Sequence, residues 1–226
     1  MSKLFAGAQN LGKSLMLPIA VLPAAGLLLG FGGVFTNPVT ISTYPALNSE
    51  VIQAIFTVMK LCGSVVFDNL SLLFAVGIAV GMARSDKGTA GLAAVLCFIV
   101  MNKAINASLL LSGTLASENL AAAGQASVMG ITTLQTGVMG GIMSGLLAFW
   151  VQKRFGKTEL PSLLAFFSGS RFVPIVSSFF AIFLGVALFW VWPHIQTGIT
   201  HLGGLVEKTG YVGTLFYGMI LKCLIP

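Results

Sequence analysis

The sequence has very little charge. Of its 226 residues only 8% are charged and six are acidic, whereas a water-soluble domain carries roughly a quarter charged residues. So few polar groups would not cover the surface of a soluble protein, which argues against an ordinary soluble domain. None of the six carboxylates forms an acid–base pair, and nothing in the sequence resembles a self-sufficient catalyst.

Cysteine and histidine are also scarce. Cys62, Cys97 and Cys223 form neither a CxxC pair nor a cluster with His194 or His201, so neither a metal site nor a disulfide framework is predicted. The GxxxxGKS/T phosphate loop is missing, and we expect no cofactor. Although the net charge is +6, no basic stripe with interleaved aromatics occurs, so we expect no nucleic-acid partner.

Apolar residues make up 56% of the chain, and the mean hydropathy is +0.96. A helix needs about 20 apolar residues to cross a bilayer. The sequence offers such runs at residues 15–35, 70–83, 89–111, 137–151, 172–192 and, incompletely, 211–226. We predict an all-α, polytopic membrane protein with five complete spans, the start of a sixth and short interfacial amphipathic helices.

Residues 51–69 are apolar but interrupted by Lys60 and Asp68. They either extend the second span as a broken helix or lie in the membrane interface. We favour a helix pair with a break near residues 63–69.

Most positive charges lie in three short clusters. These are Lys3 with Lys13, Arg84 with Lys87, and Lys153, Arg154, Lys157 with Arg171. A cytoplasmic amino terminus puts all three clusters inside and leaves at most Lys60 and Lys208 outside, as the positive-inside rule requires. Residues 113–136 then form an outer loop, for which we expect a solvated connection with a short helix.

Prolines and glycines inside the spans predict bends and close helix contacts. Pro18 and Pro23 each remove a backbone donor, so the first span should bend, either for transport or as ordinary packing. Gly137, Gly141 and Gly145 share one helical face, where another backbone can approach. The partner is either another span of this chain or a second subunit.

Two lysines lie inside predicted spans, where an unpaired charge costs a few kcal/mol. Lys103 lies 14 residues into its span, about 21 Å along a helix, so we interpret it as reaching the outer boundary by snorkelling. Lys222 lies eleven residues into the last run, just before Pro226. It either donates hydrogen bonds to a polar ligand or marks the cytoplasmic end of a span.

Five segments of the chain form a recognisable set. They are LGKSLMLPIAVLP at 11–23, LFAVGIAVG at 73–81, TGVMGG at 136–141, LPSLLAFF at 160–167 and RFVPI at 171–175. Together they resemble enzyme IIC, the membrane component of bacterial phosphotransferase-system (PTS) sugar permeases, in the branch that takes up glucose, N-acetylglucosamine, maltose and related glucosides. The resemblance covers essentially the whole chain.

The resemblance implies a ten-span permease that dimerises through its first five spans and moves sugar with a second, elevator-like domain. A partner or fused B domain then phosphorylates the sugar from a phosphocysteine at the inner face. We therefore expect residues 1–210 to form the membrane interface (dimerisation) domain and residues 211–226 to begin the sugar-binding transport domain, which is truncated here. The family's Phe-Gly-Leu-His-His and later glutamate motifs are absent.

The resemblance also assigns one site residue. Residues 222–226, KCLIP, match the family motif Arg-Cys-Leu-x-Pro, so Lys222 takes the place of an arginine associated with the sugar site. Lysine keeps the charge but loses the bidentate fork. Lys222 is thus the expected substrate-binding residue, whereas Cys223 differs from the phosphorylated cysteine of the B domain. No catalytic, phosphorylatable residue is expected in this chain, and its status as an enzyme stays open.

The predicted function is the membrane component of a phosphoenolpyruvate-dependent sugar phosphotransferase system, as a truncated or partial permease. It translocates a hexose or glucoside, glucose or maltose-like, for phosphorylation by an EIIB partner. The alternative is a non-transporting membrane interaction or dimerisation fragment. An unrelated channel or secondary transporter is disfavoured, because the apolar runs from residue 70 onward contain no acid. The expected setting is the bacterial inner membrane, as a homodimer.

The inner loop 153–171 is predicted to carry a short amphipathic helix over residues 160–167 along the membrane interface. Its basic neighbours face anionic lipid or the phosphorylated B domain, or serve only to retain the loop inside.

Overall fold

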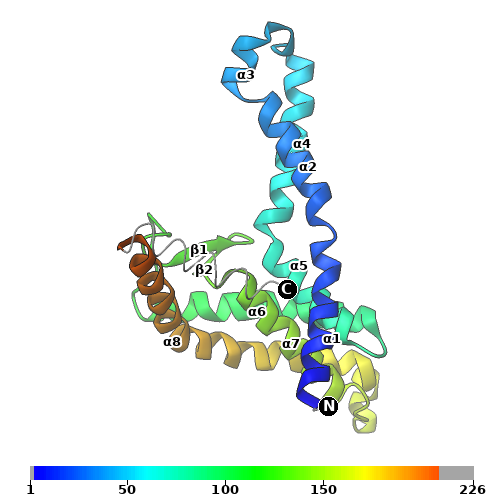
Figure 1. The fold of residues 1–226 in the computed structure, drawn as a ribbon. Coiled ribbons are helices and arrows are strands. Elements are labelled where there is room, and N and C mark those ends of the chain that lie inside the picture. The colour runs from blue at the N-terminus through cyan, green and yellow to red at the C-terminus, as the bar shows by residue number, and fades with distance from the viewer. Residues whose placement is uncertain (1–2, 209–226) are drawn as a thin grey trace.

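The structure is a computed structural model, and it describes residues 3–208. It consists almost wholly of helices (Figure 1). Their order along the chain is α1 (Lys3–Ile19), α2 (Leu22–Phe35), α3 (Pro38–Thr43), η1 (Pro45–Leu47), α4 (Glu50–Asp68), α5 (Leu70–Met82), α6 (Lys87–Leu111), β1 (Gln125–Val128), β2 (Ile131–Leu134), α7 (Gly137–Phe155), η2 (Ser162–Phe167), η3 (Gly169–Arg171) and α8 (Phe172–Lys208). Helices α2 and α4 pack on each other, α1 packs on α5, and α5 joins a bundle of α6, α7 and α8.

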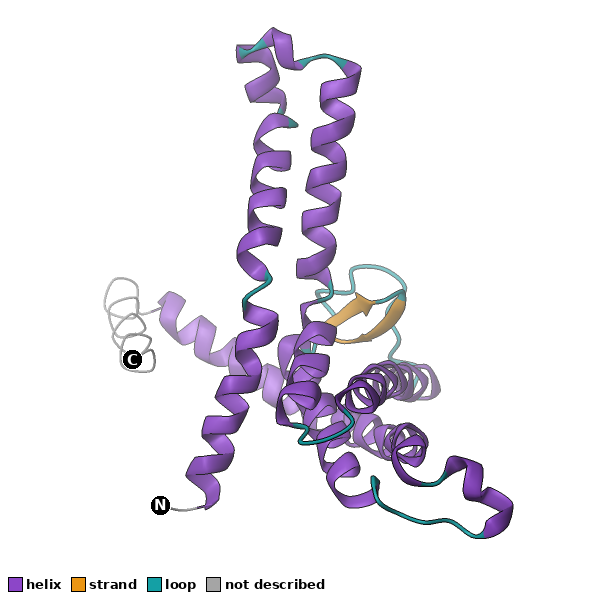
Figure 2. Cartoon of the chain, turned by 90° about the vertical axis from the view of Figure 1, so that its right-hand side faces the viewer, coloured by secondary structure: helices purple, strands orange, loops and turns teal. Residues whose placement is uncertain are grey.

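The first long helix is interrupted where the two prolines predict a bend. Helix α1 ends after Pro18, the amide of Val21 turns back to the Pro18 carbonyl at 3.3 Å, and Pro23 lies in the first turn of α2. Figure 2 shows the short break between the two helices. Proline has no backbone N–H to donate, so the break falls where intrahelical hydrogen bonds are missing, as predicted.

The second long helix breaks at Asn69, between α4 and α5, which confirms the expected helix pair. The Asn69 amide and its side-chain Nδ2 both donate to the Val65 carbonyl, at 3.1 and 2.8 Å. Gly63 lies within α4 and does not break it. A Cβ at Gly63 would lie 2.5 Å from the backbone nitrogen of Leu29, so this glycine lets α2 and α4 approach closely.

Four helical stretches among residues 3–208 are long and apolar enough to cross a membrane. They are Gln9–Phe35, Glu50–Asp68, Lys87–Leu111 and Gly169–His201. Three of them contain the expected spans at 15–35, 89–111 and 172–192. The expected span 70–83 corresponds to α5, which has only 13 residues and is preceded by the longer α4. The expected run 211–226 lies outside the described residues.

The helix that packs against the glycines of α7 is α5. A Cβ at Gly145 would lie 2.5 Å from the Ala75 carbonyl oxygen of α5, and Gly141 faces the backbone of Ser71 in the same helix. Gly137 has φ +52°, and a Cβ added there would meet nothing within 4 Å, so Gly137 takes no part in this contact. The partner of Gly141 and Gly145 is therefore another helix of the same chain, and close backbone approach holds it there.

The loop at residues 113–136, which we expect on the outside from the sequence, contains a β-hairpin in place of the expected short helix. Strands β1 and β2 pair antiparallel around Met129 and Gly130, whose φ angles are 51° and 77°. Two central residues with positive φ make the tight turn that matches strand twist. Strand β2 packs on α6, where Asn106 Nδ2 donates to the Thr132 carbonyl at 2.7 Å. The chain is thus mostly helical, with this hairpin as an exception to the all-α expectation.

Helix α6 lies at the centre of the bundle and buries Phe98, Met101 and Ile105. Beside it, α8 continues past Pro193 to Lys208, beyond the predicted end of the span at residue 192. Trp192 of α8 is only 6% exposed, and its Nε1 donates to the Gln135 carbonyl at 3.1 Å. This hydrogen bond ties the end of the hairpin segment to α8.

Candidate functional site

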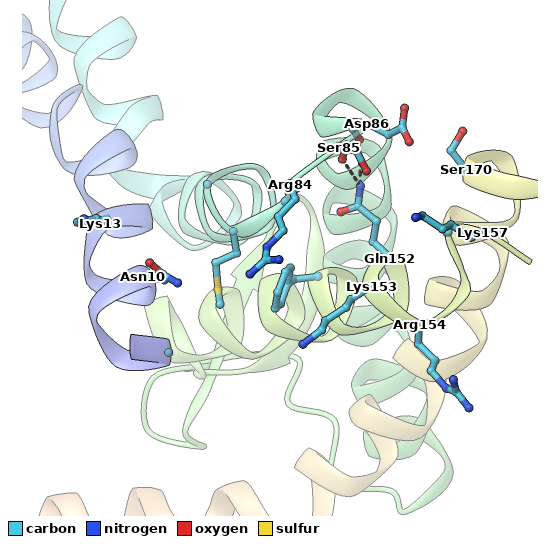
Figure 3. A pocket seen from close by; sticks show the side chains of 16 residues that line it. Asn10, Lys13, Arg84, Ser85, Asp86, Gln152, Lys153, Arg154, Lys157 and Ser170 are labelled. Atoms are coloured by element: carbon cyan, nitrogen blue, oxygen red, sulfur yellow. Dashed lines mark hydrogen bonds between the residues drawn. The ribbon is translucent and has the colours of Figure 1, made fainter. Parts of the chain in front are cut away.

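The basic clusters of the sequence meet in one cavity of about 1050 Å³ (Figure 3). The cavity lies between α1, the loop that joins α5 to α6, and the carboxyl end of α7. Five of its lining residues are cationic, namely Lys13, Arg84, Lys153, Arg154 and Lys157. Asp86 is the acidic residue among the lining. The arrangement is suited to hold an anion.

Close packing of α1 on α5 positions Lys13. Ser14, the next residue, is 3% exposed. A Cβ added at Gly81 would lie only 2.7 Å from the Ser14 side chain, so α1 can pack this closely on α5 only because residue 81 is glycine. One turn later, Pro18 covers Gly77 in the same way. Because the two glycines of α5 leave room for α1, the exposed Lys13 side chain lies beside the end of α5 and the loop that follows it.

Gln152 of α7 holds the loop that carries Arg84. Its Nε2 donates to the carbonyls of Ser85 and Asp86, at 2.8 and 3.1 Å (Figure 3). Asp86 has φ 48°, a left-handed conformation that reverses the chain before α6 begins. The Oε1 atom of Gln152 is buried and has no hydrogen-bond partner. No sequence motif marks Gln152, and only the fold identifies its role.

Lys153 and Arg154 lie in the last turn of α7, where the helix dipole favours positive charge. The following loop is closed by two hydrogen bonds, from the Gly169 amide to the Thr158 carbonyl and from the Leu160 amide to Ser168 Oγ, both 3.0 Å long. This closure keeps the loop close to the end of α7.

The segment 160–167 forms a 3₁₀ helix, η2 (Ser162–Phe167), rather than the α-helix implied by an amphipathic prediction. Arg171 stays with this segment, since its Nη1 donates to the Phe166 carbonyl at 3.2 Å and its guanidinium lies 4.8 Å from the Phe166 ring centre. Phe166 itself is 71% exposed. Arg171 therefore does not line the cavity, although the sequence grouped it with residues that do.

The structure describes one of the two lysines that the sequence places inside predicted spans. Lys103 is exposed, and its Nζ donates to Asn106 Oδ1 at 2.9 Å, next to the hairpin. That Lys103 reaches the outer boundary of the membrane stays a prediction. Lys222, the expected substrate-binding residue, lies outside the described residues, as does Cys223. Within residues 3–208 no group of three or more His, Cys, Asp or Glu side chains is placed to hold a metal ion.

Comparison with known proteins agrees with the motif set. Residues 12–226 match the family model described as phosphotransferase system, EIIC. The chain is also 43% identical over 225 residues to the PTS system glucose-specific EIICBA component of Staphylococcus saprophyticus. That match covers 99% of this chain and 33% of the relative, so the chain spans about a third of the length of the curated relative. The chain belongs to the EIIC family of integral membrane components of the phosphotransferase system, as its motifs predicted.

Proposed function

We propose that this chain is part of the membrane component of a phosphoenolpyruvate-dependent phosphotransferase system. It translocates a hexose or glucoside, glucose or a maltose-like sugar, for phosphorylation by an EIIB partner. The observation that carries the proposal is the family match over residues 12–226, together with 43% identity to a glucose-specific relative. That relative is glucose-specific by name, which supports glucose over other sugars.

The chain crosses the membrane five times within its described part, through α1–α2, α4–α5, α6, α7 and α8, and a sixth crossing begins at residue 211. The loops 83–86, which carries Arg84, and 156–171, which carries Lys157 and Arg171, then share one side of the membrane with the amino terminus. The segment of α3 and η1 and the β-hairpin share the other side. The positive-inside rule supports a cytoplasmic amino terminus, since the cationic cavity lies on the first side.

Residues 1–210 form the membrane interface (dimerisation) domain, and residues 211–226 begin the transport domain. A homodimer is supported by the arm of α2, α3 and α4, which projects away from the bundle (Figure 1). Leu27, Phe31 and Val34 of α2 and Ile55 and Val58 of α4 are each more than half exposed on this arm. A second copy would cover them, and mass determination of the solubilised chain tests for it.

Lys222 contacts the sugar, in the place that the family motif gives to an arginine. Lysine donates hydrogen bonds to sugar hydroxyls but lacks the planar fork of arginine. In a complete transport assay we expect Lys222→Gln to raise the KM for sugar and Lys222→Arg to leave it near the unchanged chain. Equal KM values for all three would remove Lys222 from the site.

The deciding experiment reconstitutes the chain in proteoliposomes with the soluble phosphotransfer proteins and phosphoenolpyruvate. The remaining two thirds of the relative is supplied as a second polypeptide or left out. We expect accumulation of sugar phosphate inside the vesicles when both polypeptides are present, with glucose favoured over maltose. Accumulation by the chain alone would contradict the assignment of residues 1–210 to an interface domain.

The alternative, a non-transporting interaction fragment, is tested in the same vesicles. It requires that the chain co-purifies with an intact permease. It also requires that no sugar phosphate accumulates when the chain and the second polypeptide are present together. The exposed apolar arm is the observation that favours it. Sugar transport by the chain together with the second polypeptide, without an intact permease, would contradict it.

A further inference from the structure

The convergence of cations at the inner end of the protein needs an explanation beyond membrane topology. Retention of loops on the cytoplasmic side requires only that Lys and Arg lie on that side. It does not require side chains from α1, from the α5–α6 loop and from α7 to line one cavity, as Lys13, Arg84 and Lys153 do. A cavity lined by five cations, with Asp86 as the acidic residue of the lining, attracts anions.

We propose that the cavity binds the phosphate group of an anionic phospholipid of the cytoplasmic leaflet, with Arg84 and Lys153 as the central contacts. Figure 3 shows these two side chains in the middle of the site, between Lys13 on α1 and Lys157 beyond the end of α7. The Arg84 guanidinium can bind phosphate oxygens in a bidentate manner, and the lysines add point charges.

The depth of the cavity matches a headgroup. Trp150 of α7 lies one turn before Lys153 and Arg154, is 48% exposed, and packs edge-on against Phe180 at 5.4 Å between ring centres. Exposed tryptophan is enriched at the level of lipid headgroups. The cationic groups one turn nearer the cytoplasm are therefore level with the phosphates of the inner leaflet.

Apolar surface next to the cavity supplies a place for the acyl chains. Met16 and Leu17 lie three and four residues after Lys13, on the same side of α1, and are 67% and 60% exposed. A phospholipid can thus place its phosphate among the cations and its chains along α1. This continuity favours a lipid over a soluble phosphorylated protein, which has no acyl chain to bury. Basic pockets between helices on the cytoplasmic side are a known form of lipid recognition.

The test measures lipid binding to the purified full chain in detergent by native mass spectrometry, so it does not depend on transport or on orientation. The probes are dioleoyl phosphatidylglycerol and dioleoyl phosphatidylcholine. The cavity variant is Arg84→Gln with Lys153→Gln. The matched control is Lys87→Gln with Arg171→Gln, which removes the same charge from the same end but outside the cavity. A charge-preserving variant, Arg84→Lys with Lys153→Arg, checks that loss of binding is not loss of fold.

We expect phosphatidylglycerol to bind the cavity variant at least about tenfold more weakly, because this variant loses two cationic contacts to the phosphate, each worth about 1 kcal/mol. The control removes two charges that do not line the cavity, so the control and the charge-preserving variant should bind within about twofold of the unchanged chain. Equal weakening of both charge-removing pairs would overturn the proposal in favour of general attraction. Displacement of the lipid by millimolar inorganic phosphate would assign the cavity to a free phosphate. Unchanged lipid binding with lost capture of a phosphorylated B domain would assign it to that protein.

Discussion

Replacing Gly145 with alanine is expected to force α5 and α7 apart. The new Cβ would lie 2.5 Å from the Ala75 carbonyl oxygen and 3.1 Å from both the Ala75 Cα and the Ile78 Cβ. Ordinary carbon–oxygen contacts are about 3.3–3.6 Å, so the helices must separate by up to about 1 Å. A gap of that size forfeits about a quarter to a half of each contact energy, and overpacking of this kind costs about 1–3 kcal/mol.

The assay is unfolding of the full chain in mild detergent by increasing SDS, followed by tryptophan fluorescence. The matched control is Gly30→Ala in α2, where a Cβ meets nothing within 4 Å and alanine improves helix propensity by up to about 1 kcal/mol. Both variants gain the same helix propensity, so we expect their free energies of unfolding to differ by the overpacking cost alone, about 1–3 kcal/mol. If both unfold at the same SDS concentration, α5 and α7 are not in the close contact described above.

Three further changes test other parts of the structure. Trp192→Phe should lower the free energy of unfolding by about 1 kcal/mol, because the partly buried hydrogen bond to the Gln135 carbonyl is lost. Trp190→Phe, at a residue that is 70% exposed, should leave the free energy of unfolding unchanged, and equal effects of the two substitutions would contradict the inward placement of Trp192. Gln152→Ala should release the α5–α6 loop, seen as faster hydrogen exchange just before α6, and unchanged exchange would contradict the clamp. In a chain without its native cysteines, Ser42→Cys on the outer side should react with an impermeant maleimide added outside cells. Ser85→Cys on the inner side should not react. The reverse pattern would invert the proposed topology.

Local patterns account for much of what could be predicted. Hydropathy places the long helices, because any chain in the bilayer must satisfy its backbone hydrogen bonds internally over about 20 residues. Pro18 and Pro23 mark the first break for a similarly local reason, since each removes a backbone donor. The hairpin was missed, although its turn signal, Met129–Gly130 between two runs with β-branched residues, is present in the sequence.

Glycine contacts were predictable in kind but not in partner. The spacing of Gly141 and Gly145 predicts a close helix contact, but the same spacing would allow contact with a helix of a second subunit as well as with α5. Gly137 fits the spacing too, but it lies in the first turn of α7 with a positive φ, and a Cβ added there would meet nothing within 4 Å. The spacing of small residues therefore predicts which face of a helix makes a close contact, and tertiary packing decides which neighbouring helix covers that face.

The sequence by itself determined that this is a membrane protein of the EIIC family, where its first helix bends and which side of the membrane its charges favour. Only the tertiary structure decided that Lys13, Arg84 and Lys153 line one cavity, that Gln152 holds the loop beside it and that Arg171 stays outside. The physical reason is that helices in a bilayer are apolar on nearly all sides. Hydropathy therefore predicts which segments cross the membrane and how long they are, while close packing at a few small residues decides which helices contact one another.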